Sequence, residues 1–281
     1  MKPAPFRYVA AETVDEVVAA LAEHGDEAKV LAGGQSLVPL MNLRLAVPGV
    51  LVDVNRVAEL GGISVNGTVE VGAVTRQAAL ERSVEAQAAA PLTGDALRHV
   101  AFPGVRSRGT VGGSIAHADP ASELCAVLLA LGGEVVARGP SGVRTIAADD
   151  LFVTYFTTAL APDEVLTHVR FPKADRTGFA EVSRKSGDFA LAGAAVALTM
   201  SGDVVGSARI ALFGVADRPV RATGAEQALA GRVPADAAAD AGRAASQELE
   251  AKSDGHASAG YRRQVVGVVV RRALEQAGGG S

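Results

Sequence analysis

Two short stretches decide how this chain folds and what it binds: Ala32-Gly33-Gly34-Gln35-Ser36 and Thr110-Val111-Gly112-Gly113-Ser114. Each contains a Gly-Gly pair, ends in a serine and lies beside an apolar run. A Gly-Gly pair tolerates positive φ and has no Cβ to keep a ligand away from the backbone. In such a turn the backbone N–H groups can converge on an anion, and a serine hydroxyl adds a donor. The repeated pattern predicts two turns that hold a ligand with two phosphates from both sides.

The usual dinucleotide motifs are absent from the sequence. A Rossmann fingerprint needs Gly-x-Gly-x-x-Gly between a strand and a helix, with an acid about twenty residues further on. No such run occurs, and there is no P-loop. Because the two glycine stretches fall in separate parts of the predicted fold, we expect the ligand to lie between two lobes.

The composition excludes several classes of protein. The net charge of −4, without a dense basic stripe, predicts no nucleic-acid partner. No apolar run approaches the roughly 20 residues that span a bilayer, and the N-terminal residues lack the apolar core of a signal peptide. We therefore expect a cytoplasmic protein without a transmembrane segment. The single cysteine, Cys125, lies in an apolar run and predicts a buried side chain, and five scattered histidines predict no metal site.

Local patterns predict a small α/β lobe at the N-terminus. Residues 13–16 (Thr-Val-Asp-Glu) form a capping box that begins a helix, and Gly25 ends it. Strands are expected at residues 28–32 and 50–54, and the first of them runs directly into the first glycine stretch.

A second lobe is predicted to be richer in strands. Asn66-Gly67 between two alternating runs predicts a hairpin. Thr75 is expected to cap a short helix, residues 86–100 to form one helix, and Ala118-Asp119-Pro120-Ala121-Ser122-Glu123 to begin a helix that ends at Leu131. Further strands are expected at residues 134–137, 143–146 and 165–171.

A polar linker before residue 178 marks a change of character. Strands and then alanine-rich helices follow, which predicts a separate α/β domain. We place the first domain at residues 1–175, with lobes at about 1–57 and 58–175, and the second at residues 176–281. The apolar side of the last predicted helix, residues 258–276, either packs on its own sheet or forms a contact surface.

The ordered motifs resemble the FAD-binding medium subunit of the molybdenum hydroxylases, the family of aerobic carbon monoxide dehydrogenase and xanthine dehydrogenase. Besides the two glycine stretches and residues 118–123, the resemblance includes residues 151–160, Arg184-Lys185-Ser186-Gly187-Asp188-Phe189-Ala190 and Tyr261-Arg262-Arg263. It covers essentially the whole chain. It implies an α+β fold, with a two-lobed FAD-binding domain of the vanillyl-alcohol-oxidase type followed by a smaller α/β C-terminal domain.

The resemblance also implies which residues bind the cofactor. Both glycine stretches would hold the FAD pyrophosphate and the adjoining ribityl and ribose groups, and Thr110 would help to hold phosphate. Glu123 or, alternatively, Asp119 would contact the adenosine end. Leu160 would pack near the cofactor, and the Lys185 cation would lie near the flavin ring, where it can stabilise the anionic reduced form. The cofactor-binding set is Ala32, Gly33, Gly34, Gln35, Ser36, Leu37, Thr110, Val111, Gly112, Gly113, Ser114, Ile115, Asp119, Glu123, Leu160 and Lys185.

By the same resemblance, the chain is an electron-transfer subunit without catalytic acid–base residues of its own. A large subunit with the molybdenum cofactor and a small subunit with [2Fe–2S] clusters would be its partners, as a dimer of heterotrimers. Electrons would pass from the clusters through FAD to an external acceptor. Neither glycine stretch contains a histidine, and Cys125 is predicted to be buried, so we expect FAD to be bound non-covalently.

Two other functions are compatible with the glycine stretches. One is a stand-alone FAD-dependent oxidase or reductase, and the other is a non-redox module that binds a dinucleotide. For the main hypothesis we expect valine at Gly33 or at Gly112 to abolish FAD binding while the chain still folds, because the side chain would take the place of the phosphate.

Overall fold

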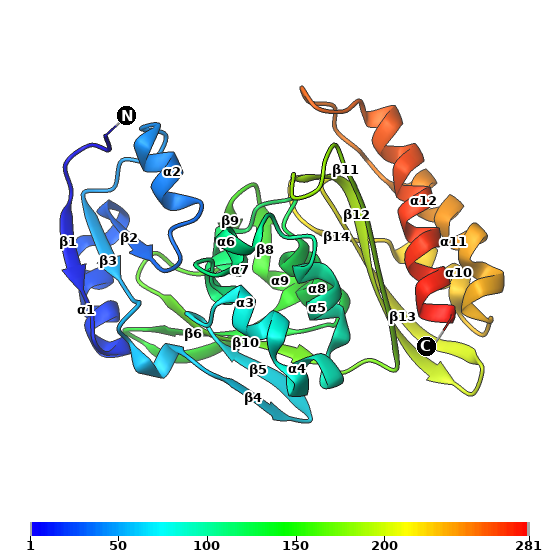
Figure 1. The fold of residues 1–281 in the computed structure, drawn as a ribbon, viewed down its shortest axis with the longest axis horizontal. Helices are drawn as coiled ribbons and strands as arrows, with labels where there is room; N and C mark the ends of the chain where they lie inside the picture. The colour runs from blue at the N-terminus through cyan, green and yellow to red at the C-terminus, as the bar shows by residue number, and fades with distance from the viewer. Residues whose placement is uncertain (1, 280–281) are drawn as a thin grey trace.

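The first part of the chain is a three-stranded parallel sheet with one long helix. The computed structural model describes residues 2–279. Strands β1 (Arg7–Ala10), β2 (Ala28–Leu31) and β3 (Val50–Asp53) pair in the order β1-β3-β2 (Figure 1). Between β1 and β2 lie α1 (Val14–His24) and the short η1 (Gly25–Glu27), and α2 (Leu37–Asn42) precedes β3. As predicted, the Thr13 hydroxyl caps α1 by accepting from the Glu16 N–H at 3.2 Å.

The middle part is built on a five-stranded antiparallel sheet. Its order is β4-β5-β10-β6-β7. The predicted Asn66-Gly67 hairpin is confirmed, with Gly67 at a φ of 77°. The strands are β4 (Ile63–Asn66), β5 (Thr68–Gly72), β6 (Glu134–Gly139), β7 (Gly142–Ala147) and β10 (Val165–Pro172), and η2 (Ala58–Leu60) precedes them.

Seven short helices and a small two-stranded sheet pack with this middle sheet (Figure 1). Cys125, in the helix α8 (Glu123–Ala130), is fully buried, as predicted, and burial raises the pKa of its thiol to about 12. The helices are α3 (Gln77–Arg82), α4 (Val84–Ala89), α5 (Pro91–Leu97), α6 (Pro103–Arg106), α7 (Val111–His117), α8 (Glu123–Ala130) and α9 (Ala148–Leu151), and the strands are β8 (Phe152–Thr154) and β9 (Thr157–Thr158).

Two helix predictions in this part were wrong. Residues 86–100 do not form one helix, because Pro91 has no N–H to continue the hydrogen-bond pattern and α5 restarts there. Thr75 does not cap a helix, because its hydroxyl donates to the Gly62 carbonyl at 2.9 Å and α3 begins later, at Gln77.

The last part is a four-stranded antiparallel sheet covered by helices. Strands β11 (Arg176–Ser183), β12 (Ala190–Ser201), β13 (Val204–Phe213) and β14 (Val220–Arg221) pair in that order. Helices α10 (Thr223–Leu229), α11 (Pro234–Glu248) and α12 (Ala259–Gly278) cover one face (Figure 1). The apolar side of α12 is buried against this sheet, so it is not a free contact surface.

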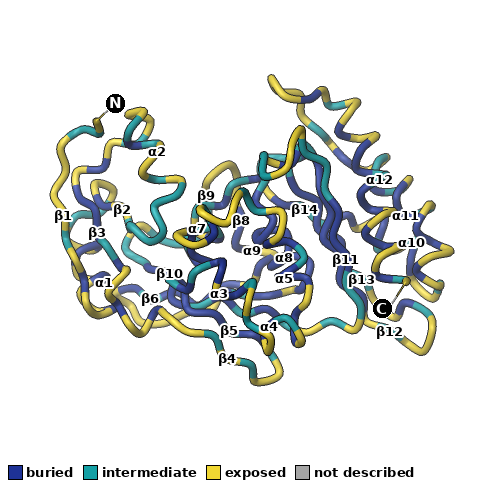
Figure 2. Tube along the Cα trace, in the orientation of Figure 1, coloured by how far each residue is buried: buried dark blue, intermediate teal, exposed yellow. Residues whose placement is uncertain are grey.

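Both faces of this last sheet are buried. Phe179 and Phe213 face the middle core, and their rings lie 5.5 Å apart. Alternate residues such as Val196 and Ile210 face the helices. The tube in Figure 2 shows the buried residues continuing from the middle part into this sheet. The sheet is therefore packed firmly against the middle part. The predicted α+β fold class, with the smaller domain at the C-terminal end, is confirmed.

Candidate functional site

The first glycine stretch follows β2 and leads into α2. The chain bends here, with Gly34 at a φ of 70°, and the Gln35 amide donates to the Gly33 carbonyl at 3.0 Å. The backbone N–H groups of residues 33–37 make no hydrogen bond to any residue between 2 and 279. This stretch therefore presents a run of backbone donors that the described chain does not use, as the sequence pattern predicted for an anion site.

The second Gly-Gly pair lies in a helix and not in a turn. Thr110 caps α7, and Gly112 and Gly113 are in its first turn. The Val111 N–H donates to the Thr75 carbonyl at 2.9 Å, and the Gly112 N–H donates to the Ala73 carbonyl at 3.0 Å. Gly113 N–H donates to the Thr110 hydroxyl and the next amide to the Thr110 carbonyl, both at 3.1 Å. The expectation that this stretch also supplies free backbone donors was wrong for these four amides.

Hydroxyl groups are what this second stretch can still offer. Thr110 Oγ1 accepts from an amide, so its own proton is available to a ligand. Ser114 Oγ lies 3.0 Å from Ser122 Oγ, so these two hydroxyls form a hydrogen bond with each other. The other predicted residue of α7, Ile115, is fully buried and belongs to the middle core.

The two glycine stretches touch each other. A Cβ added to Gly33 would lie 2.5 Å from the Arg108 carbonyl oxygen, 2.8 Å from Gly109 Cα and 3.1 Å from Thr110 N. One added to Gly113 would lie 3.7 Å from the Ala32 Cβ. The structure thus brings together the two stretches that the sequence singled out, and it explains Gly33 by the close approach of another backbone segment.

Close packing around Gly33 and Gly112 means that a substitution at either glycine affects the packing of the protein as well as a bound ligand. A Cβ added to Gly112 would lie 2.5 Å from the Ala73 Cβ and 2.6 Å from its Cα. Valine at Gly33 or at Gly112 would therefore collide with the protein itself. The reason given for that expectation does not hold, because the space beside these two glycines is occupied by the chain, and such variants should also lose stability.

Two polar residues that the sequence analysis missed link the stretches. Asn55 Nδ2 donates to the Ala32 carbonyl at 2.8 Å, and Asn55 Oδ1 accepts from Arg76 Nη2 at 2.8 Å. Arg76 Nη1 then donates to the Arg108 carbonyl at 2.7 Å. The signal that could have revealed Asn55 is its position just after β3, where the ends of parallel strands meet.

Asp119 and Glu123 lie on either side of the start of α8. Asp119 Oδ1 accepts from the Ala121 N–H at 2.8 Å, and the helix begins at Glu123 rather than at Pro120. Asp119 is half-buried and Glu123 is buried. Burial raises the pKa of Glu123 to about 8, and the nearby charges of Glu181 and Asp119 act in the same direction.

Leu160 and Lys185 come from two other segments. Leu160 is half-buried and packs against the middle core. Lys185 is exposed in the loop between β11 and β12. In that loop Gly187, at a φ of 74°, would place a Cβ 2.9 Å from both the Ala101 carbonyl oxygen and the Phe102 ring. The Lys185 loop is therefore held against the segment that leads to the second glycine stretch.

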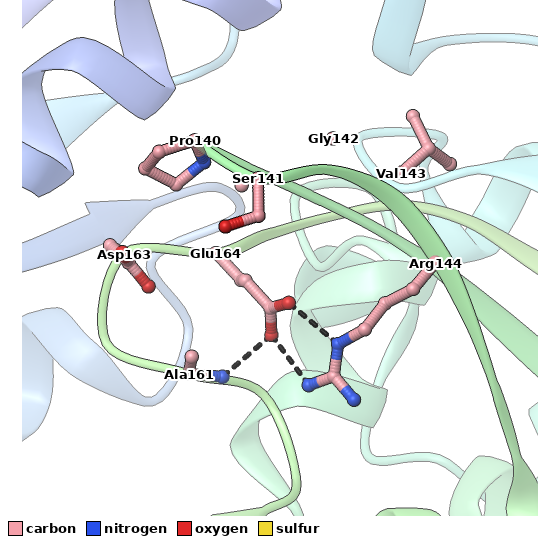
Figure 3. A pocket seen from close by; sticks show the side chains of 9 residues that line it. Pro140, Ser141, Gly142, Val143, Arg144, Ala161, Asp163 and Glu164 are labelled. Atoms are coloured by element: carbon pink, nitrogen blue, oxygen red, sulfur yellow. Dashed lines mark hydrogen bonds and ion pairs between the residues drawn. The ribbon is translucent and has the colours of Figure 1, made fainter.

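A surface pocket elsewhere in the molecule contains none of the predicted residues. It lies at the β6–β7 hairpin and is shown in Figure 3. Arg144 Nε donates to Glu164 Oε1 at 2.6 Å, and the Ala161 N–H donates to the other carboxylate oxygen at 2.7 Å. These polar groups satisfy one another, so we assign no ligand to this pocket.

Residues 2–279 contain neither a candidate metal centre nor a helix suited to crossing a membrane. No group of histidine, cysteine, aspartate and glutamate side chains within them is arranged to hold a metal ion. None of the helices described is long and apolar enough to cross a membrane.

Two family models match the chain along nearly its whole length. Residues 4–174 match the FAD binding domain in molybdopterin dehydrogenase. Residues 177–277 match the CO dehydrogenase flavoprotein C-terminal domain.

Full-length relatives and solved structures agree with these matches. The chain is 41% identical to the carbon monoxide dehydrogenase medium chain of Hydrogenophaga pseudoflava, over 99% of this chain and 98% of that one. It is 40% identical to 6-hydroxypseudooxynicotine dehydrogenase complex subunit alpha of Paenarthrobacter nicotinovorans, over 99% and 96%. A structure of carbon monoxide dehydrogenase from Hydrogenophaga pseudoflava, lacking the Mo-pyranopterin moiety, superposes with a TM-score of 0.94 at 42% identity, covering 99% and 98%. The chain therefore belongs to the family of FAD-binding medium subunits of the carbon monoxide dehydrogenase-like molybdenum hydroxylases, which are oxidoreductases.

Proposed function

We propose that this chain holds FAD non-covalently between its two N-terminal lobes and transfers electrons within a molybdenum hydroxylase complex. The observation that carries the proposal is the run of unused amides at residues 33–37, which lies against the stretch that contains Thr110. A pyrophosphate is bound by several backbone or hydroxyl donors close together. The amides of residues 33–37 and the Thr110 hydroxyl are donors of this kind, which supports the proposal.

The donor groups fit an FAD pyrophosphate in their chemistry. The first stretch offers backbone N–H groups, and the second offers the hydroxyls of Thr110 and Ser114. Neither stretch contains a histidine, and the only cysteine is buried with a thiol pKa of about 12. The absence of a histidine from both stretches and the burial of the cysteine support non-covalent binding, because a covalent flavin link needs an accessible nucleophile.

The remaining predicted residues would surround the other ends of the cofactor. Asp119 or Glu123 would contact the adenosine end, and Leu160 would pack against the cofactor. Lys185 would place a positive charge beside the flavin ring and so favour electron density there. Bound FAD supplies the redox chemistry, since it accepts electrons one at a time and releases two. The chain's own part is to bind, orient and shield it.

The proposed partners follow from the relatives, several of which are named as medium chains or subunits of dehydrogenase complexes. We propose a large subunit with the molybdenum cofactor and a small subunit with [2Fe–2S] clusters, assembled as a dimer of heterotrimers in the cytoplasm. Within this chain we assign residues 1–175 to FAD and residues 176–281 to the C-terminal domain.

The test is to isolate the native complex through a tag on this chain and to analyse it for flavin, iron and molybdenum together. We expect acid-extractable FAD, iron and molybdenum in a fixed ratio. FAD without the metals would contradict the electron-transfer assignment and support a stand-alone flavoenzyme. Metals without FAD would contradict the binding site.

A further inference from the structure

We propose that Asn55 and Arg76 form a strut that sets the spacing of the two glycine stretches and thereby the affinity of the site for FAD. The inference rests on the proposed function, because it concerns how the FAD site is held open and aligned. Neither Asn55 nor Arg76 belongs to any of the sequence motifs described above.

The strut is one continuous series of hydrogen bonds from lobe to lobe. It runs from the Ala32 carbonyl to Asn55 Nδ2, from Asn55 Oδ1 to Arg76 Nη2, and from Arg76 Nη1 to the Arg108 carbonyl, at 2.8, 2.8 and 2.7 Å. Each end is attached beside the close contact of the two stretches. Ala32 precedes Gly33 in the chain, and the Arg108 carbonyl is the oxygen that approaches Gly33.

The orientation of the Asn55 amide is fixed by Asp53. Asp53 Oδ1 accepts from both the backbone N–H and Nδ2 of Asn55, at 2.8 and 2.6 Å. The Tyr8 hydroxyl donates to the other carboxylate oxygen at 2.5 Å. Burial by itself would raise the pKa of Asp53, but the hydrogen bonds from Tyr8 and Asn55 outweigh it and lower the pKa. Asp53 therefore stays charged at neutral pH and directs the amide oxygen of Asn55 towards Arg76.

The lobes need such a link at this place because their backbones are not joined here. Among residues 2–279, no hydrogen bond runs directly from residues 32–37 to residues 108–115. The first stretch belongs to the three-stranded sheet, whereas residue 110 is bridged to Arg76 next to the five-stranded sheet. The contact at Gly33 prevents the stretches from coming closer, and the strut prevents them from moving apart.

Only a planar, forked cation can do this from position 76. A guanidinium donates in two fixed directions at once, while an ammonium is a single point charge on a flexible stem. Asn55 is exposed and Arg76 half-buried, so the strut contributes little to the burial of the core. Its removal should therefore change ligand binding more than it changes folding.

The experiment compares Asn55→Ala, Arg76→Ala, Arg76→Lys and the double alanine variant in the full-length chain. Arg82→Ala is the matched control, since Arg82 is an exposed arginine at the end of α3 and its side chain makes no hydrogen bond to any described residue. FAD affinity is measured by flavin fluorescence on titration of the apoprotein, and folding is followed by urea denaturation of the same apoprotein.

We expect each single variant to weaken FAD binding about tenfold, as loss of a hydrogen bond that positions the site would. The double variant should bind FAD no more weakly than the single alanine variant with the lower affinity, because both changes break the same series of hydrogen bonds. Lysine at position 76 should behave like alanine, and the urea midpoints should match that of Arg82→Ala. Wild-type affinity in the variants, additive losses, or full rescue by lysine would overturn the strut. A wild-type chain that binds no FAD would overturn the proposed function itself.

Discussion

Alanine at Gly33 is the substitution whose effect the structure defines best. The added Cβ would lie 2.5 Å from the Arg108 carbonyl oxygen and 2.8 Å from Gly109 Cα. Both are backbone atoms, so they cannot rotate away as a side chain can. Ordinary contact distances begin at about 3.5 Å, which means that the two stretches must separate by roughly 1 Å. Overpacking of this kind costs about 1–3 kcal/mol of folding free energy.

The assay measures urea unfolding and FAD affinity of Gly33→Ala beside Gly104→Ala. Gly104 lies in α6, shortly before Arg108 in the chain, but a Cβ there meets nothing within 4 Å and its φ is not positive. We expect Gly33→Ala to lose about 1–3 kcal/mol of stability and at least about tenfold in FAD affinity. Gly104→Ala should be neutral or gain up to about 1 kcal/mol. If the two variants behave alike, the lobe contact does not control the site.

Two further predictions concern α7 and α8. Thr110→Ala removes the cap of α7 and should cost about 1 kcal/mol of unfolding free energy, while Thr110→Ser keeps the hydroxyl and most of that stability; equal losses in urea denaturation would contradict the capping role. Glu123 has a folded-state pKa of about 8 against 4.5 for the free side chain, so the folded apoprotein keeps a proton that the unfolded chain loses. The unfolding free energy of the wild-type apoprotein should therefore fall as pH rises from about 4.5 to about 8. Glu123→Gln should make this dependence on pH flatter, and near pH 8 the variant should be more stable than wild type. Parallel profiles for the two proteins would show that Glu123 is not the group responsible.

Local patterns were sufficient where one short stretch determines the structure. The capping residue Thr13 begins its helix and the Asn66-Gly67 pair forms its hairpin, since both depend on hydrogen bonds or backbone angles within a few residues. The first glycine stretch is a bend after a strand for the same reason. These features need no information from the rest of the chain.

The predictions that failed depended on partners distant in sequence. The amides of Val111 and Gly112 bond to the carbonyls of Thr75 and Ala73, which lie far away in the chain, and these bonds fix the second Gly-Gly pair as a helix start. Asn55 was missed because its partners are likewise spread over both lobes. A single sequence does not reveal which loops meet.

The glycines show why a ligand and a neighbouring backbone are hard to tell apart in a sequence. Both require the absence of a Cβ. In the structure these requirements fall on different atoms of the same stretch, because the Cα of Gly33 faces residues 108–110 while the amides of residues 33–37 remain unused. A side chain added at Gly33 therefore tests the contact between the lobes and not the contact with phosphate. In the proposed function the amides would bind phosphate only while that contact holds the two stretches in place. Packing between the lobes would then be a condition for binding rather than an alternative to it.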